Sequence, residues 1–173
     1  MEDSFKHIFL IGMMGSGKSS VGMTLSQKLN LPHIDTDEDL MDILNLDMNQ
    51  IFETFNEERF HVLESTYFIE HIKNNKYIYS TGGGIILNSQ NRSTMNKFGK
   101  TILLKSSISN LYNRLKQDTK NIRPLFKKNN TKKNLQKIWN DREKYYTECA
   151  DYIIKVDNKS INEISNEIIK KLN

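Results

Sequence analysis

Short apolar runs alternate with helix-period patterns along this 173-residue chain. Residues 7–11 have the length and composition of a β-strand, and Val21, Leu25 and Leu29 then recur on one helical face. Further strands are predicted at 31–34, 77–80, 100–104 and 152–156. This alternation is typical of βαβ units, which build a parallel sheet covered by helices on both faces. We therefore expect a single α/β domain, a three-layer α/β/α structure with a five-stranded parallel sheet.

The segments between the strands differ in the regularity of their helical patterns. Residues 38–74 contain several breaks and predict two or three helices. Their apolar positions are interpreted as core: Ile51, Phe52, Phe55, Phe60, Leu63 and Tyr67. Residues 160–163 form a capping box that opens the last helix. The polar stretch at about 117–131 has no regular pattern, and irregular loops of this length are often active-site lids.

The strongest candidate for chemistry follows the first strand. Residues 12–19 fit the P-loop pattern GxxxxGK[ST], with a predicted strand before them and a predicted helix after them. Backbone N–H groups and the helix N-terminus would hold phosphate oxygens there. Lys18 would reach the β- and γ-phosphates, and the Ser19 hydroxyl would ligate Mg²⁺. The residues expected to bind the nucleotide are Gly15, Ser16, Gly17, Lys18, Ser19 and Ser20.

Two further segments follow predicted strands. Asp35 and Asp37 come after the second strand, and Gly82, Gly83 and Gly84 come after the third. The carboxyl ends of parallel strands are where α/β folds bind ligands. The aspartates could instead cap the helix that begins after them, and the glycines could form a tight turn. For the glycines we favour close approach of a ligand, because one or two glycines usually suffice for a turn.

Composition argues against several functional classes. The charged fraction of 27% and the lack of a long apolar run leave no membrane span, and residues 1–4 lack the layout of a signal peptide. The single cysteine, Cys149, cannot form an internal disulfide, which suits a reducing cytoplasm. The net charge is +4, and the basic run at 127–133 has no interleaved aromatic residues. We interpret that run as a solvated segment rather than a nucleic-acid site.

Five features together resemble the shikimate kinase family over residues 8–156, in their order and approximate spacing. They are the P-loop, Asp35-Thr36-Asp37, the segment from Ile51-Phe52 to Glu64, Thr81-Gly82-Gly83-Gly84, and Arg123-Pro124-Leu125 followed by Arg142 and Tyr146. A P-loop alone occurs in many unrelated NTPases, whereas this combination is far more specific. The resemblance implies the fold of the nucleoside monophosphate kinase group, with a substrate-binding region at about 35–64 and a lid at about 117–131.

The same resemblance implies the reaction. The γ-phosphoryl group of ATP would be transferred, with Mg²⁺, to the 3-hydroxyl of shikimate on the pathway to chorismate and the aromatic amino acids. We expect a cytoplasmic monomer that acts on small molecules and binds neither nucleic acid nor membrane. Two other functions stay open, a kinase of the same fold that acts on gluconate or a nucleotide, and a non-catalytic nucleotide-binding relative.

The roles of individual residues follow from the family motifs that they match. Asp35 corresponds to the carboxylate that helps to hold Mg²⁺ through water. Asp37 corresponds to the carboxylate that hydrogen-bonds the substrate hydroxyls and accepts the proton, and Gly82, Gly83 and Gly84 correspond to the backbone that lies against the shikimate ring. Catalysis would rest on Lys18 and Asp37 together with an arginine of the lid.

Two arginines match family positions. Arg123 corresponds to the lid arginine that approaches the ATP phosphates, and Arg142 corresponds to one that pairs with the substrate carboxylate. A surface salt bridge is the alternative for each. Either Arg114 or Lys116 could be a second phosphate-facing residue, and the adenine contact is expected near 157–159.

One position departs from the family pattern. His61 stands where the family has an arginine that grips the substrate carboxylate, so an imidazole replaces a bidentate and permanently charged guanidinium. His61 could bind the carboxylate more weakly, the substrate could differ, or a shifted helix could bring Arg59 into this role. Arg59 lies about 200° round a helix from His61. We favour weakened binding of shikimate through His61 and Arg142.

Overall fold

Five parallel strands form the centre of the structure, in the order β2-β3-β1-β4-β5. The computed structural model describes residues 6–72, 75–118 and 131–173. The strands are β1 (His7–Ile11), β2 (His33–Asp35), β3 (Ile78–Ser80), β4 (Gly99–Lys105) and β5 (Tyr152–Lys155). In the register of the sheet, Ile8 lies beside Ile78 on one side and Lys100 on the other. The predicted α/β fold with a five-stranded parallel sheet is confirmed.

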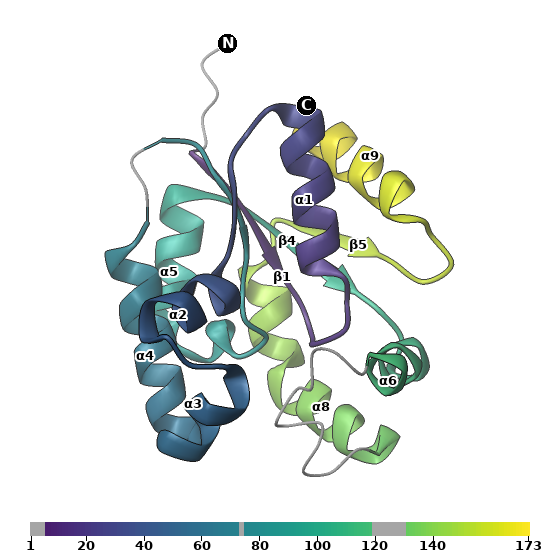
Figure 1. Cartoon of the computed structure of the whole chain (residues 1–173). Helices are drawn as coiled ribbons and strands as arrows, with labels where there is room; N and C mark the ends of the chain where they lie inside the picture. The colour runs from purple at the N-terminus through teal and green to yellow at the C-terminus, as the bar shows by residue number, and fades with distance from the viewer. Residues whose placement is uncertain (1–5, 73–74, 119–130) are drawn as a thin grey trace.

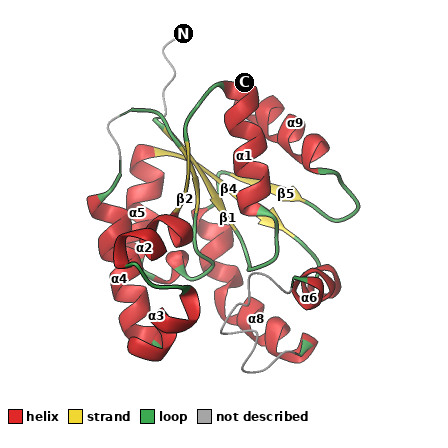
Figure 2. Cartoon of the chain, in the orientation of Figure 1, coloured by secondary structure: helices red, strands yellow, loops and turns green. Residues whose placement is uncertain are grey.

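Helices cover the sheet and extend beyond one end of it, as Figure 2 shows. They are α1 (Lys18–Leu29), α2 (Thr36–Leu44), α3 (Met48–Thr54), α4 (Glu57–Glu70), the 3₁₀ helix η1 (Ile85–Leu87), α5 (Ser89–Phe98), α6 (Ile108–Gln117), α8 (Lys132–Cys149) and α9 (Ile161–Leu172). The predicted breaks between 38 and 74 separate α2, α3 and α4. Asp47 and Asn56 cap the last two of these through their side chains, so local sequence sets where they begin.

Alternate residues of the central strand face two separate cores. Phe9 and Ile11 pack on one face against side chains from α4, α5 and α8. Ile8 and Leu10 pack on the other face against α1 and α9. Figure 1 shows the same arrangement, with α1 and α9 on one side of the sheet and α5 and α8 on the other. The period of two along a strand therefore produces the three-layer structure.

Strand boundaries differ slightly from those predicted. β2 begins at His33, after Pro32, which has no N–H to donate to the sheet. β3 begins at Ile78, because the N–H of Tyr77 donates to Nδ1 of His7 at 3.3 Å instead of joining the strand ladder. β4 gains Gly99 and Lys105 at its ends.

The order of the strands brings the candidate segments to one edge of the sheet. β1 lies between β3 and β4, so its carboxyl end is the point from which chain connections run in opposite directions. The P-loop leaves β1 there, Asp35 ends β2, and Gly82 follows β3 closely. Thr81 ties these ends together, since its N–H and hydroxyl both donate to the carbonyl of Leu10 at 3.1 Å.

Across residues 6–72, 75–118 and 131–173, none of the helices is both long and apolar enough to cross a membrane.

Candidate active site

The P-loop takes a conformation that requires glycine at three positions. Gly12, Gly15 and Gly17 have φ angles of 148°, 79° and 92°. At Gly12 a Cβ atom would also lie 2.7 Å from the carbonyl oxygen of Leu104. α1 begins at Lys18, and no side chain caps its first turn, so its N–H groups are available to an anion.

Side chains of the P-loop are arranged around a cleft. The Lys18 ammonium donates to the carbonyls of Gly12 and Met13 at 2.9 and 3.0 Å. The Ser16 hydroxyl lines the cleft, and its buried oxygen has no hydrogen-bond partner among the described residues. A buried polar atom of this kind calls for a partner that belongs to a ligand. The loop therefore fits the phosphates of a nucleotide.

Asp35 connects the P-loop with the start of α2. One carboxylate oxygen accepts from the Ser19 hydroxyl at 2.5 Å. The other oxygen accepts from the N–H groups of Asp37 and Glu38 at 3.1 and 3.4 Å and so caps the helix. For Asp35 the capping interpretation is therefore correct. The cap uses only one carboxylate oxygen, so the other remains for the cleft. Mg²⁺ prefers oxygen ligands, so Ser19 and Asp35 fit this ion.

The cleft beside the P-loop is large, with a volume of about 780 Å³. The residues expected to bind nucleotide all line it: Gly15, Ser16, Gly17, Lys18, Ser19 and Ser20. Arg114 also lines it and donates to the carbonyl of Gly15 at 3.3 Å, whereas Lys116 is not among its lining residues. Of these two alternatives the geometry favours Arg114. Arg123 lies outside the described residues.

In the segment expected to contact adenine, Asp157 makes structural hydrogen bonds. Asp157 accepts from the hydroxyl of Ser106 at 2.6 Å and from the N–H of Ser107 at 3.0 and 3.1 Å. Burial raises the pKa of the Asp157 carboxyl, but these hydrogen bonds outweigh that effect and lower the pKa to about 2. Asp157 thus holds the loop after β4 against the loop after β5. Lys159, two residues on, lines the cleft.

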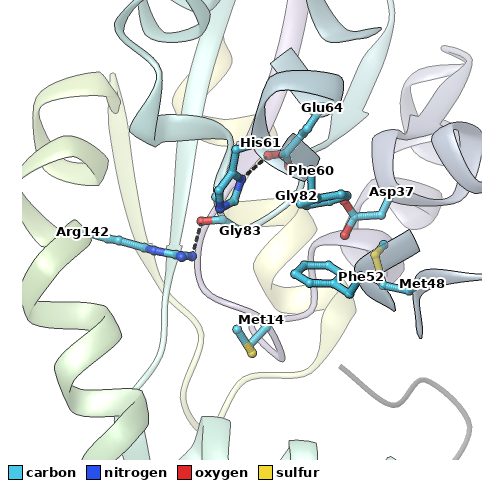
Figure 3. Close-up of a pocket in the computed structure, with 11 residues that line it drawn as sticks. Met14, Asp37, Met48, Phe52, Phe60, His61, Glu64, Gly82, Gly83 and Arg142 are labelled. Carbon is cyan, nitrogen blue, oxygen red and sulfur yellow. Dashed lines mark hydrogen bonds and ion pairs between the residues drawn. The ribbon is translucent and has the colours of Figure 1, made fainter. Parts of the chain in front are cut away.

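A second and smaller pocket opens next to this cleft. Figure 3 shows Arg142 and His61 on one side of it and Asp37, Met48 and Phe52 on the other. Its lining consists of Met14, Asp37, Met48, Phe52, Phe60, His61, Glu64, Gly82, Gly83, Gly84 and Arg142. The structure therefore brings together all six residues that the sequence suggested for substrate binding. The pocket and the cleft share four lining residues: Met14, Asp37, Met48 and Gly83.

Two of the three glycines that follow β3, Gly82 and Gly84, allow side chains to approach closely. A Cβ at Gly82 would lie 1.9 Å from Oε1 of Glu64, and one at Gly84 would lie 2.1 Å from Cε1 of His61. At Gly83 the nearest atom would be 3.5 Å away. Approach of a ligand is thus not required to explain Gly82 and Gly84, because protein side chains already occupy the space.

Arg142 is a buried residue, although its Nη2 also lies 3.9 Å from Oε1 of the half-exposed Glu57. The residue is 7% exposed, and Nη1 donates to the carbonyl of Gly83 at 3.1 Å. The hydroxyl of Tyr146, one turn later on α8, donates to the same carbonyl at 2.5 Å. These bonds direct the guanidinium of Arg142 toward the pocket.

Glu64 is a site residue to which no sequence motif assigned a role. It is 2% exposed, and its Oε2 lies 3.1 Å from Nδ1 of His61. Burial raises the pKa of the Glu64 carboxyl; the hydrogen bond from His61 and the charge of Arg142 oppose this rise, and the nearby Asp37 adds to it. The spacing of three residues on α4 is the signal that could have linked Glu64 with His61. Arg59 is exposed and is absent from the lining of this pocket.

Two aromatic residues interpreted as core also form a wall of the pocket. The rings of Phe52 and Phe60 lie 4.7 Å apart and both border the cavity. Phe60 also packs with Leu40, Ile51 and Tyr67 in the small core that joins α2, α3 and α4. One apolar pattern thus serves both a core and a binding surface, and hydrophobic periodicity cannot separate the two.

Comparison with known proteins agrees with this geometry. The sequence model of the family described as shikimate kinase matches residues 14–173. Shikimate kinase of Enterococcus faecalis is 36% identical over 165 residues, which cover 95% of this chain and 97% of that protein. Shikimate kinase of Dictyoglomus turgidum is 38% identical over 164 residues, or 94% of each chain.

A solved structure supports the same relationship. Shikimate kinase from Acinetobacter baumannii in complex with shikimate superposes with a TM-score of 0.92 at 25% identity. The match covers 98% of this chain and 94% of that one. Together with the sequence matches, this means that the chain belongs to the shikimate kinase family.

Proposed function

We propose that this protein is a shikimate kinase, which transfers the γ-phosphoryl group of ATP to the 3-hydroxyl of shikimate in the biosynthesis of chorismate and the aromatic amino acids. The observation that carries this proposal is the small pocket that adjoins the P-loop cleft. It combines a buried guanidinium, Arg142, with a carboxylate, Asp37, that also borders the cleft. Shikimate carries a carboxylate on one side of its ring and hydroxyls on the other, so these two groups suit it.

In the proposed reaction the 3-hydroxyl oxygen bonds to the γ-phosphorus while the bond from that phosphorus to the bridging oxygen of ADP breaks. Asp37 orients the hydroxyl and accepts its proton. Lys18 and the N–H groups at the start of α1 stabilise the negative charge on the phosphates. Such a reaction depends on positioning and charge neutralisation rather than on covalent help from the protein.

We propose Ser19 and Asp35 as the residues that hold Mg²⁺, the first directly and the second through water. When bound, Mg²⁺ would neutralise charge on the phosphate oxygens of ATP. Arg123 is proposed to complete the phosphate contacts from a lid at about 117–131, most of which lies outside the described residues. Residues 35–64 are proposed as the substrate-binding region, with support from Asp37, Phe52 and His61 in the pocket.

We further propose that the protein acts in the cytoplasm as a monomer, on small molecules, without a nucleic acid or a membrane as partner. Sedimentation at micromolar concentration, with and without ATP and shikimate, would test the oligomeric state.

The experiment that tests the proposed function is an ADP-release assay with Mg²⁺-ATP against shikimate, gluconate and a panel of nucleosides. We expect turnover with shikimate and none with the other acceptors, and loss of turnover in Lys18→Ala. Turnover with gluconate or a nucleoside alone would point to another kinase of this fold. ATP binding without consumption of any acceptor would point to a non-catalytic relative.

A further inference from the structure

His61 lies between two carboxyl groups of its own helix. Its Nδ1 is 3.1 Å from Oε2 of Glu64, within hydrogen-bond range. Its Nε2 is 3.8 Å from Oε1 of Glu57, which is too far for a hydrogen bond. Nε2 is buried and has no hydrogen-bond partner among the described residues. Since His61 lines the pocket, a ligand bound there would supply the partner that this nitrogen lacks.

The charges around this pocket are poorly balanced for an acidic ligand. Among the described lining residues, Arg142 alone is permanently cationic, whereas Asp37 and Glu64 are both carboxylic acids. The half-exposed Glu57 adds a further carboxylate 3.9 Å from Nη2 of Arg142. A bound carboxylate would bring one more negative charge into a largely desolvated site, which is unfavourable unless another positive charge appears.

Within the part of the chain that the structure describes, each charged or titratable group that faces His61 and Glu64 can be assigned to an element. They are Glu57 on α4, Asp37 on α2, and Arg142 and Tyr146 on α8. Burial raises the pKa of the Tyr146 hydroxyl, which donates to Gly83 and stays neutral. The loop that contains Gly82 and Gly84 also packs here, and it contributes only backbone atoms.

The protonation of the pair decides what the pocket offers to a ligand. If the pair holds no extra proton, a neutral His61 that donates from Nδ1 to an ionised Glu64 presents a lone pair at Nε2, which repels a carboxylate. If the pair gains one proton, Nε2 becomes an N–H donor beside Arg142, and the charge of Glu64 is compensated. Only the protonated pair can therefore hydrogen-bond a substrate carboxylate through Nε2.

We propose that this pocket binds its acidic substrate with uptake of one proton, which is held by the His61–Glu64 pair. The inference rests on the proposed function in one respect, namely that the substrate is a carboxylic acid. Affinity is then greatest at low pH, where the free pair is already protonated, and it falls as pH rises through the pH at which the pair releases its proton. In that range the Kd for shikimate rises by up to about tenfold for each pH unit.

Calorimetric titration with shikimate in the absence of ATP tests this inference. We expect the wild-type Kd to rise with pH across the range in which the pair releases its proton, and buffers of different ionisation enthalpy to reveal uptake of close to one proton at the alkaline end. In His61→Arg a permanent charge replaces the shared proton, so Kd becomes independent of pH and proton uptake vanishes. His71→Arg is the matched control, because His71 ends the same helix without lining the pocket, and it should behave as the wild type.

Glu64→Gln provides a second variant. It keeps an acceptor for Nδ1 but removes the negative charge that favours an imidazolium, so the rise in Kd should begin at lower pH. A pH-independent wild-type Kd, or an unchanged pH profile in both His61→Arg and Glu64→Gln, would overturn the proton coupling. Turnover of shikimate with such a flat profile would leave the proposed function intact. Failure to bind shikimate at every pH would overturn both.

Discussion

The hydroxyl of Ser19 donates to the carboxylate of Asp35 across 2.5 Å, and the second oxygen of that carboxylate caps α2. The Asp35 side chain therefore makes structural hydrogen bonds and a hydrogen bond at the phosphate site at the same time. Ser19 belongs to the P-loop and Asp35 to the end of β2, so the pair also joins the two segments that would hold Mg²⁺.

Substitution of Asp35 should separate these two tasks. Asn keeps an oxygen that can cap α2 but loses the charge, so in Asp35→Asn we expect a 10–100-fold weaker apparent affinity for Mg²⁺, on the order seen when groups around metal ligands are removed. Thermal stability should change little, because Asn is as good a cap as Asp. Steady-state rates measured against Mg²⁺ concentration check this, with the exposed Asp42→Asn on the same helix as the control. An unchanged Mg²⁺ dependence would exclude Asp35 from the metal site.

The carboxylate end of the pocket yields a prediction about affinity. His61→Arg should lower the KM for shikimate at pH 8, by about tenfold, since a charged hydrogen bond contributes about 1.5–3 kcal/mol. The same change at His71 should leave KM as it is. A KM in His61→Arg that is equal to or higher than that of the wild type would contradict the proposed role of His61.

Most of the architecture could be predicted from the sequence, because it depends on local patterns. The apolar run at 7–11 and the glycines of the P-loop need no tertiary information, and the capping box at Ser160 is itself local. Parallel strands then bring Asp35, Asp37 and the glycines after β3 to a common edge.

The parts of the site that the sequence missed or left open depend on tertiary contacts. Glu64 resembles any acid of an amphipathic helix until its burial against Gly82 is known. Arg142 would suit a surface position equally well, and the bond to the carbonyl of Gly83 is what directs it inward. Phe60 was interpreted as core and forms a pocket wall as well, which a hydrophobic pattern does not distinguish.

Two neighbouring glycines should respond differently to the same substitution. In Gly82→Ala the new methyl group would lie 1.9 Å from Oε1 of the buried Glu64, so we expect a loss of about 1–3 kcal/mol in the free energy of unfolding. In Gly83→Ala the nearest atom would be 3.5 Å away, and the loss should be much smaller. Urea denaturation of the two variants provides the measurement. Equal losses would mean that the approach of Glu64 is not what requires glycine at 82.

Asp157 gives a prediction for the pH dependence of stability. Its pKa is lowered to about 2 in the folded protein, against about 3.9 in an unfolded chain. Its contribution is therefore fully present above about pH 4 and is lost as pH falls toward 2. Asp157→Asn should be less stable than the wild type at pH 6, and the difference should shrink at pH 3. Urea titrations at the two pH values test this, and a difference that grows on acidification would contradict it.

The proposed reaction transfers the γ-phosphoryl group of ATP to one particular hydroxyl of a ring acid. The most direct test is to incubate the purified protein with Mg²⁺-ATP and shikimate and to locate the phosphate on the product by ³¹P–¹H correlation NMR. The proposed function predicts shikimate 3-phosphate, formed in equal amount to ADP. Phosphorylation at another position, or ATP that stays intact in the presence of shikimate, would contradict it.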